Sequence, residues 1–257
     1  MPVTRSEIDL ALKSLLKPVI FSDYCPNGLQ VEGRDSISKI VTGVTACQAL
    51  IESAVDAGAD ALLVHHGYFW KGEDATLTGI KRRRIERLLR EEISLFAYHL
   101  PLDVHEELGN NVQLARLLNL QIKGDLLKQN RFPLVLYGEL ETEMSAAQFA
   151  RLLAKKLGRN PAHVIPEGRS ADAILKTFAW CTGAAQGYID LAARAGVDAY
   201  ISGEISEPTF HVARESSLHY FAAGHHATER YGVQAVGNYL AREFGITHQF
   251  IDIDNPV

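Results

Sequence analysis

The sequence of 257 residues predicts an α/β protein with two similar domains and mostly parallel sheets. Short apolar runs alternate with helical patterns of about 10–15 residues, which is typical of βαβ units. The runs are apolar throughout, as expected of strands that helices cover on both faces. One strand–helix–strand pattern also occurs twice along the chain, which favours two related halves.

Composition and charge narrow the class further. The chain is 47% hydrophobic and 22% charged, which excludes disordered and disulfide-scaffold proteins. A net charge of −5 and a pI of about 6.1 argue against general affinity for nucleic acid or membranes. No apolar run approaches the ~20 residues of a membrane span. Cys25, Cys47 and Cys181 form no C-x-x-C pair, so we expect reduced thiols and a cytoplasmic location.

The first predicted element is a helix that begins after Thr4. Thr4 and Glu7 form a capping-box pattern, and Pro18 ends the helix. Apolar residues recur between them at helical spacing, at Ile8, Ala11, Leu12, Leu15 and Leu16. This N-terminus predicts a folded start, not a targeting peptide.

The next hundred residues predict three strands and three helices in alternation. The strands are 40–44, 61–64 and 95–98, and the helices are 49–57, 80–92 and 111–118. The pattern changes near residue 126, where 131–140 is extended and 145–157 is a helix. Later strands are 178–181, 199–201 and 218–221. We therefore divide the chain into one domain of 1–125 with 224–257 and a second of 126–223.

The internal repeat lies at two helix-to-strand turns. Residues 57–61 and 195–199 share the pattern A-G-x-D-A, and an apolar strand follows each. This pattern is also common in unrelated α/β units, because glycine often ends helices. The first copy ends in His65-His66 and the second in Gly203-Glu204, so we expect the first copy to carry the chemistry.

Histidines and acids follow three of the predicted strands. They are His65 and His66 after 61–64, His99 and Asp103 after 95–98, and His225, His226 and Glu229 after 218–221. Since parallel strands present their carboxyl ends at one sheet edge, we expect these side chains to meet there. A helix starting near Ala227 would set His225 and Glu229 one turn apart. One such histidine alone is more typical of a hydrogen-bonded polar residue, but three clusters favour a metal site.

The donor set predicts two metal ions. Five ligands are too many for one tetrahedral site, and they are His65, His66, Asp103, His225 and Glu229. Imidazoles and carboxylates suit zinc, iron, manganese, cobalt or nickel, and the sequence does not decide among them. The basic run 81–84 is flanked by acids, which favours a solvated helix face over a nucleic-acid patch.

Four sequence blocks resemble those of the NIF-three-like proteins, whose bacterial members are often labelled GTP cyclohydrolase I type 2 homologues. The blocks are 27–31, 63–67, 99–103 and 224–230, and the short YbgI-type members match best. The resemblance implies two interlinked α/β domains, a dinuclear metal centre and a homohexamer that is a trimer of dimers. It also implies that the five ligands above hold the metals, with Glu229 bridging them.

We therefore expect a metal-dependent hydrolase acting on a nucleotide or cyclic amide-like small molecule. Two cations would lower the pKa of a shared water and stabilise developing negative charge. His99 is the candidate for orienting the ligands or carrying a proton. Two other functions fit the same sequence: a metal-handling chaperone or insertase, and a ring-shaped binding or assembly module.

Overall fold

The computed structural model describes residues 2–127 and 132–257, and the chain divides into two compact units. Unit 1 spans Met1–Gly109 and Arg230–Asp254, and unit 2 spans Asn110–Glu229 and Asn255–Val257. The predicted domain boundaries lay at 125/126 and 223/224. The first boundary of the units lies earlier, at 109/110, because strand β7 (Leu120–Asp125) pairs with β8 (Leu136–Ser145) in unit 2. The second lies later, at 229/230. Arg131, the first residue of the predicted extended segment, lies outside the described residues.

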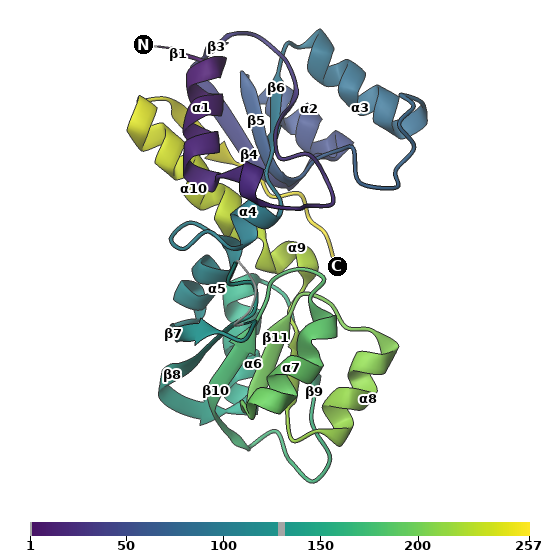
Figure 1. The fold of residues 1–257 in the computed structure, drawn as a ribbon, viewed down its shortest axis with the longest axis vertical. Helices are drawn as coiled ribbons and strands as arrows, with labels where there is room; N and C mark the ends of the chain where they lie inside the picture. Colours follow the sequence, from purple (N-terminus) through teal and green to yellow (C-terminus); the bar gives the residue numbers. More distant parts are fainter. Residues whose placement is uncertain (1, 128–131) are drawn as a thin grey trace. The chain divides into compact units, whose positions relative to one another are not determined.

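The sheet of unit 1 has the strand order β13-β4-β5-β6-β2. Its three middle strands are labelled in Figure 1. Its strands are β13 (Thr247–Phe250), β4 (Lys39–Thr45), β5 (Ala61–His66), β6 (Ser94–Ala97) and β2 (Gly28–Val31). The first four pair in parallel and β2 is antiparallel to β6. The three predicted strands 40–44, 61–64 and 95–98 therefore lie in this sheet as β4, β5 and β6, and its two edge strands, β13 and β2, were not predicted.

Helices cover both faces of this sheet, as buried parallel strands require. Ile40 and Leu63 pack with helices α1 (Arg5–Leu16) and α10 (Arg230–Phe244) on one face. Their chain neighbours Val41 and Leu62 pack with α2 (Gln48–Asp56) and α3 (Gly79–Arg90) on the other. The alternation follows from the two-residue period of a strand. Strands β1 (Val3–Thr4) and β3 (Ser36–Ile37) form a separate, two-stranded antiparallel sheet.

The predicted capping box at the first helix is confirmed. The hydroxyl of Thr4 accepts from the backbone N–H of Glu7 at 3.2 Å, and the Glu7 carboxylate accepts from the Thr4 N–H at 2.8 Å. Helix α1 ends at Leu16, one residue before the left-handed Lys17 and two before Pro18.

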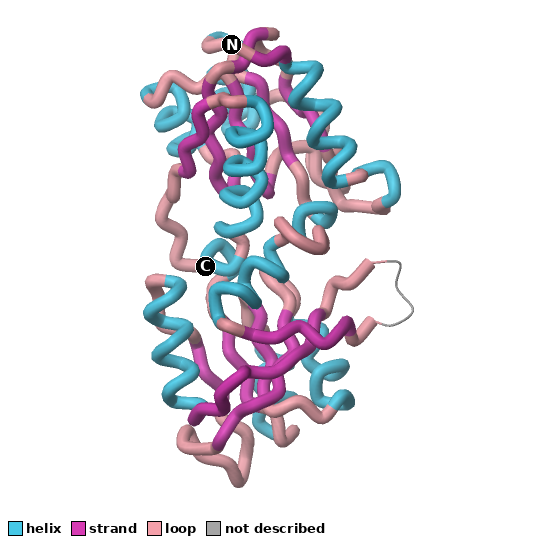
Figure 2. The backbone as a smooth tube through the Cα atoms, turned by 90° about the vertical axis from the view of Figure 1, so that its left-hand side faces the viewer, coloured by secondary structure: helices cyan, strands magenta, loops and turns pink. Residues whose placement is uncertain are grey.

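The sheet of unit 2 is mixed, with the order β7-β8-β10-β11-β12-β9. Figure 2 draws the strands in magenta and the helices in cyan. The further strands are β10 (Ile174–Trp180), β11 (Ala199–Ser202), β12 (His219–Ala222) and β9 (Ala162–Val164). Among the described residues of this sheet, only the pairs β10–β11 and β11–β12 are parallel, so the prediction of mostly parallel sheets is confirmed for unit 1 and wrong for unit 2. The unit's helices are α5 (Asn110–Leu118), α6 (Ala146–Leu157), α7 (Ile189–Ala195), α8 (Glu207–Glu215) and α9 (His225–Thr228).

Aromatic and small apolar side chains fill the two faces of this second sheet. On one face Phe149 of α6 packs against Phe178 and Phe221, with ring centroids 4.4 and 5.2 Å apart. On the other, Ile189 of α7 and Ala213 of α8 pack in one cluster with β10–β12. The two-sided α/β class predicted from the sequence is therefore present in both units.

The internal repeat is a structural repeat as well. Gly58 and Gly196 both follow helices in the left-handed conformation, at φ of 67° and 70°. The Asp60 carboxylate accepts the backbone N–H groups of residues 38 and 39 at the start of β4. The Asp198 carboxylate accepts those of residues 176 and 177 in β10 in the same way. The shared aspartate thus ties each turn to the neighbouring strand.

In the part of the chain that the structure describes, no helix has the length and apolar character of a transmembrane span.

Candidate metal centre

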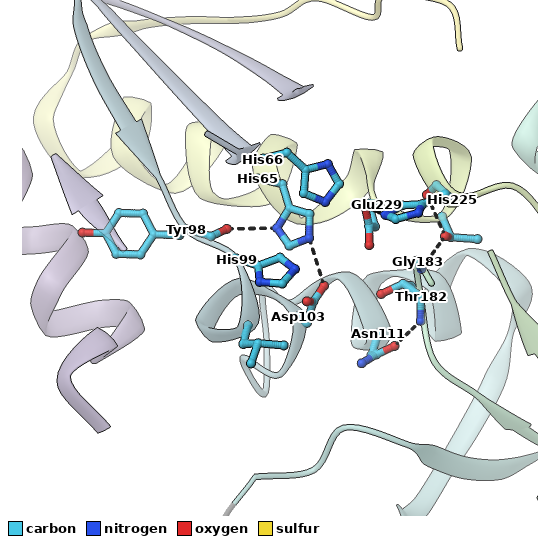
Figure 3. A network of polar contacts seen from close by, with 12 residues as sticks. His65, His66, Tyr98, His99, Asp103, Asn111, Thr182, Gly183, His225 and Glu229 are labelled. Carbon is cyan, nitrogen blue, oxygen red and sulfur yellow. Dashed lines mark hydrogen bonds and ion pairs between the residues drawn. The ribbon is translucent and has the colours of Figure 1, made fainter. Parts of the chain in front are cut away.

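His65 and His66 are the last two residues of β5, so the strand extends through them instead of ending before them. His65 is fully buried, and its Nδ1 lies 2.9 Å from the carbonyl oxygen of Tyr98 (Figure 3). A carbonyl oxygen only accepts, so Nδ1 carries the proton and Nε2 the lone pair. That Nε2 lies 3.4 Å from Asp103 Oδ1. The neighbouring His66 has its Nδ1 3.1 Å from the Thr45 hydroxyl.

His99 and Asp103 lie at the two ends of the short helix α4 (Leu100–Asp103). The helix is positioned by Asp23, whose carboxylate accepts from the backbone N–H of Leu100 at 2.9 Å and lies 2.7 Å from His99 Nδ1. Asn27 accepts the backbone N–H of His99 at 2.7 Å. The loop before β2 thus orients this turn and the His99 imidazole.

Three histidines of unit 1 come together. His65, His66 and His99 each offer a ring nitrogen, and these nitrogens lie within 4.8 Å of one another. Cys25 lies beside Asp23 and His99 in a second such group. Burial and the Asp23 charge raise the pKa of the Cys25 thiol to about 12, so the thiol keeps its proton and is a poor ligand. The imidazoles are the better donors here.

Unit 2 contributes His225 and Glu229, one helical turn apart as predicted. His225 begins α9, and its Nε2 lies 3.1 Å from Oε2 of Glu229, a carboxylate with 3% of its surface exposed. The other ring nitrogen, Nδ1, lies 2.6 Å from Glu204 Oε1. Burial alone would lower the pKa of His225, but the hydrogen bonds to Glu229 and Glu204 raise it to about 9. The position of the His225 ring between the two carboxylates therefore favours a positive charge on the ring or on a bound ion.

Gly183 makes room for the Glu229 carboxylate. A Cβ at this position would lie 2.1 Å from Glu229 Oε1 and 3.3 Å from His225 Nε2. The residue also has φ of +69°, a conformation that glycine adopts without strain. Its carbonyl accepts from Ser202 Oγ at 3.2 Å, and its N–H donates to Thr228 Oγ1 at 3.1 Å. The loop after β10 thus supports the acid side chain.

The donor set in each unit fits a divalent cation. The proton of His65 Nδ1 is held by a backbone carbonyl, and that of His225 by a carboxylate. Metal-bound histidines almost always show this arrangement, because the second partner fixes the tautomer and the ring orientation. Each Nε2 then faces a carboxylate oxygen, the second common ligand type for zinc, iron and manganese.

The prediction that three strands deliver these residues to one sheet edge is wrong. Strands β5 and β6 are neighbours in the sheet of unit 1, whereas β12 pairs with β11 in the sheet of unit 2. The sequence analysis also missed Asp23, Glu204 and the Tyr98 carbonyl. Only Glu204 had a visible signal, its place at the end of the second repeat.

The comparisons with known proteins agree with this fold. The profile of the family described as Duf34/NIF3 (NGG1p interacting factor 3) matches residues 3–256. The chain belongs to the Duf34/NIF3 family. A Pseudomonas aeruginosa protein named GTP cyclohydrolase 1 type 2 homolog is 57% identical over 234 residues, 91% of each chain.

Solved structures of the Duf34/NIF3 type share the whole fold. The structure of protein ybgI, described as of unknown function, is 48% identical with a TM-score of 0.92 and covers 99% of this chain and 100% of its own. A protein from Thermus thermophilus is 32% identical with a TM-score of 0.86, over 99% and 100% of the two chains. The α/β architecture of both units is therefore that of this family.

Proposed function

We propose that this Duf34/NIF3 protein binds two divalent cations and uses them to hydrolyse a small molecule. The ligands would be the five predicted residues, His65, His66, Asp103, His225 and Glu229. The observation that carries the proposal is the paired orientation of His65 and His225. Each has its Nδ1 on an acceptor and its Nε2 beside a carboxylate oxygen.

Two of the proposed ligands, Asp103 and Glu229, lie close in sequence to points where the chain passes from one unit to the other. Glu229 is joined to unit 1 by a single peptide bond, since Arg230 begins α10. Asp103 precedes another crossing of the chain, at Gly109–Asn110, by six residues. A carboxylate at the crossing point suits the bridging role that the family resemblance implies for Glu229.

Bound cations would lower the pKa of a water molecule and offset negative charge that develops on the substrate. The chain itself would supply orientation and proton transfer. Asp23 holds His99 by Nδ1, so the His99 Nε2 is the ring nitrogen available toward His65 and His66. A lone pair at this position can accept a proton from water or return one to a leaving group.

Aromatic side chains beside His99 fit a planar substrate ring. The ring centroid of Trp70 lies 5.0 Å from that of His99, and the ring centroid of Tyr24 lies 6.4 Å from it. Tyr24 is 63% exposed. Their loops are joined by the hydrogen bond from Lys71 N–H to the Tyr24 carbonyl at 2.6 Å. Flat aromatic faces stack on heterocyclic rings, so a nucleotide or cyclic amide-like substrate is favoured. The name of the Pseudomonas aeruginosa relative makes GTP the first compound to test.

Ligand burial favours retained cations over the metal-handling alternative. His65, Asp103 and Glu229 are 0%, 6% and 3% exposed. A chaperone that delivers metal to a client needs ligands that exchange readily. Slow release of bound metal to a chelator supports the hydrolase, and release within seconds supports metal handling.

Metal stoichiometry and turnover test the function directly. We expect about two equivalents of metal per chain in protein purified without chelator, located by anomalous scattering at the five ligands. Metal-loaded protein is then incubated with GTP and other nucleotides, and formate or phosphate release is measured. A preparation without metal, or metal located elsewhere, would refute the centre. Loaded protein that turns over no nucleotide or cyclic amide would refute the hydrolase.

The assembly and the location are further parts of the proposal. The family resemblance implies a homohexamer, which light scattering after gel filtration tests against a monomer of 28.4 kDa. The cysteines are free thiols, which suits a reducing cytoplasm. Fractionation of cells expressing the protein tests that location.

A further inference from the structure

We infer that Glu204 is a positioning residue that fixes the tautomer and orientation of His225 for metal binding; this inference rests on the proposed metal centre. Glu204 follows β11, and its Oε1 lies 2.6 Å from His225 Nδ1. The amide of Gln186 donates to the other carboxylate oxygen at 3.3 Å. The hydroxyl of Tyr220 donates to the Glu204 carbonyl at 2.5 Å, which holds the backbone. The carboxylate is therefore aimed at His225 from a fixed position.

The chemistry of the contact determines what it does. An ionised carboxylate only accepts hydrogen bonds, so the proton of this contact stays on His225 Nδ1. A metal ligand must be a neutral imidazole, so a bound cation would take the place of the Nε2 proton. The lone pair is then on Nε2, which lies 3.1 Å from Glu229 Oε2. Without Glu204, the ring could rotate or take the other tautomer, and Nε2 would no longer be a dedicated ligand. The carboxylate also makes the ring a stronger base toward a cation.

The internal repeat supports this role independently. Asp60 and Asp198 hold equivalent turns, and Ala61 and Ala199 begin the equivalent strands β5 and β11. Glu204 lies as far beyond Ala199 as His66 lies beyond Ala61. The second copy thus has a carboxylate where the first copy has a proposed ligand. In this inference the first copy of the repeat supplies metal ligands, and the second copy supplies a carboxylate that positions one.

Metal affinity measured by competition with a chromogenic chelator tests the inference. With Zn²⁺ or Co²⁺, Glu204→Ala should weaken one of the two sites by about 10–100-fold. Glu204→Gln should weaken it less, because the amide oxygen can still accept from Nδ1. Glu207→Ala is the matched control, since Glu207 lies on the next helix, has an 80% exposed side chain and pairs with the exposed His211. Its metal affinity should equal that of the wild type.

Two spectroscopic measurements separate positioning from a structural role. The visible absorption of the Co²⁺ protein should change in Glu204→Ala, while its circular dichroism without metal stays that of the wild type. In wild-type protein with ¹⁵N-labelled histidine and Zn²⁺, His225 should show a protonated Nδ1 and a metal-bound Nε2. This second measurement needs no variant, so it decides the matter even where Glu204→Ala does not fold.

The outcomes distinguish this inference from the proposed function. If His225→Ala loses metal but Glu204→Ala binds it with wild-type affinity, the role of Glu204 is overturned and the metal centre is not. A metal-bound Nδ1 on His225 also overturns it. Full metal retention by His225→Ala overturns the metal centre itself. A weakened site in Glu204→Ala, with partial recovery in Glu204→Gln, supports both.

Discussion

The imidazole of His65 donates its Nδ1 proton to the backbone carbonyl of Tyr98 at 2.9 Å. Tyr98 directly follows β6, which pairs in parallel with β5, so the pairing of two strands sets the orientation of the buried ring. A backbone acceptor cannot be removed by a side-chain substitution. Mutation therefore tests this site through the ligands and through the residues that make room for them.

We predict that His65→Ala and Glu229→Ala each remove at least one equivalent of metal while the fold survives. Each substitution deletes a donor atom that no neighbour replaces at the same position. Elemental analysis of the purified variants measures the loss, and circular dichroism checks the fold. His211→Ala, at an exposed histidine, should keep the wild-type metal content. Full metal retention in both ligand variants would show that the site is assigned wrongly.

Gly183→Ala should lower metal affinity as well as stability. The new Cβ would come within 2.1 Å of Glu229 Oε1, and the left-handed backbone at φ of +69° adds about 1 kcal/mol of strain. Gly196→Ala is the control, since Gly196 has φ of +70° and open space at the Cβ position. Both variants should lose stability in urea unfolding from the backbone strain, Gly183→Ala the more because of its added clash, and only Gly183→Ala should lose metal. Equal metal affinity in the two variants would contradict the contact with Glu229.

Stability should fall as the pH drops from about 6.5 toward 4. Burial and the neighbouring His219 lower the pKa of His163 to about 4, and burial with the Arg169 charge lowers that of His219, against an opposing effect of Asp198. The unfolded chain, with ordinary histidine pKa values near ~6.5, binds more protons in this range than the folded protein. His163 and His219 lie in neighbouring strands, and His163 Nε2 is 3.0 Å from His219 Nδ1.

Urea unfolding at a series of pH values measures this dependence. His163→Phe removes one titrating ring but keeps an aromatic face for Phe221, whose ring centroid lies 4.3 Å away. The variant should therefore show a shallower loss of stability between pH 6.5 and 4. An unchanged slope would mean that His163 titrates normally in the folded protein.

Removal of metal should lower the unfolding temperature. A ligand that binds only the folded state stabilises it by about 2.7 kcal/mol at a free concentration one hundred times its Kd. Chelator should therefore lower the unfolding temperature of wild-type protein, and added Zn²⁺ should restore it. The same treatment should have a smaller effect on Glu229→Ala. A shift of equal size in both proteins would place the stabilising metal elsewhere.

The sequence by itself predicted the α/β class, the first helix with its capping box, and three of the four parallel strands of unit 1. These features depend on local chemistry, because hydrophobic periodicity and capping residues act within a few positions along the chain. It also predicted that His225 and Glu229 touch, since helical geometry sets the spacing of residues four apart. The repeat was visible for the same reason, as a short pattern at two turns.

Only the tertiary structure decided which strands share a sheet and which residues support the ligands. Strand β12 pairs with β11 through contacts between segments that are apart in the sequence. No local sequence pattern encodes such contacts. Asp23 reaches His99 across 76 positions, and Glu204 reaches His225 across 21. A carboxylate in a loop has the same local signature whether it faces solvent or orients an imidazole. The fold alone gives these two acids their roles.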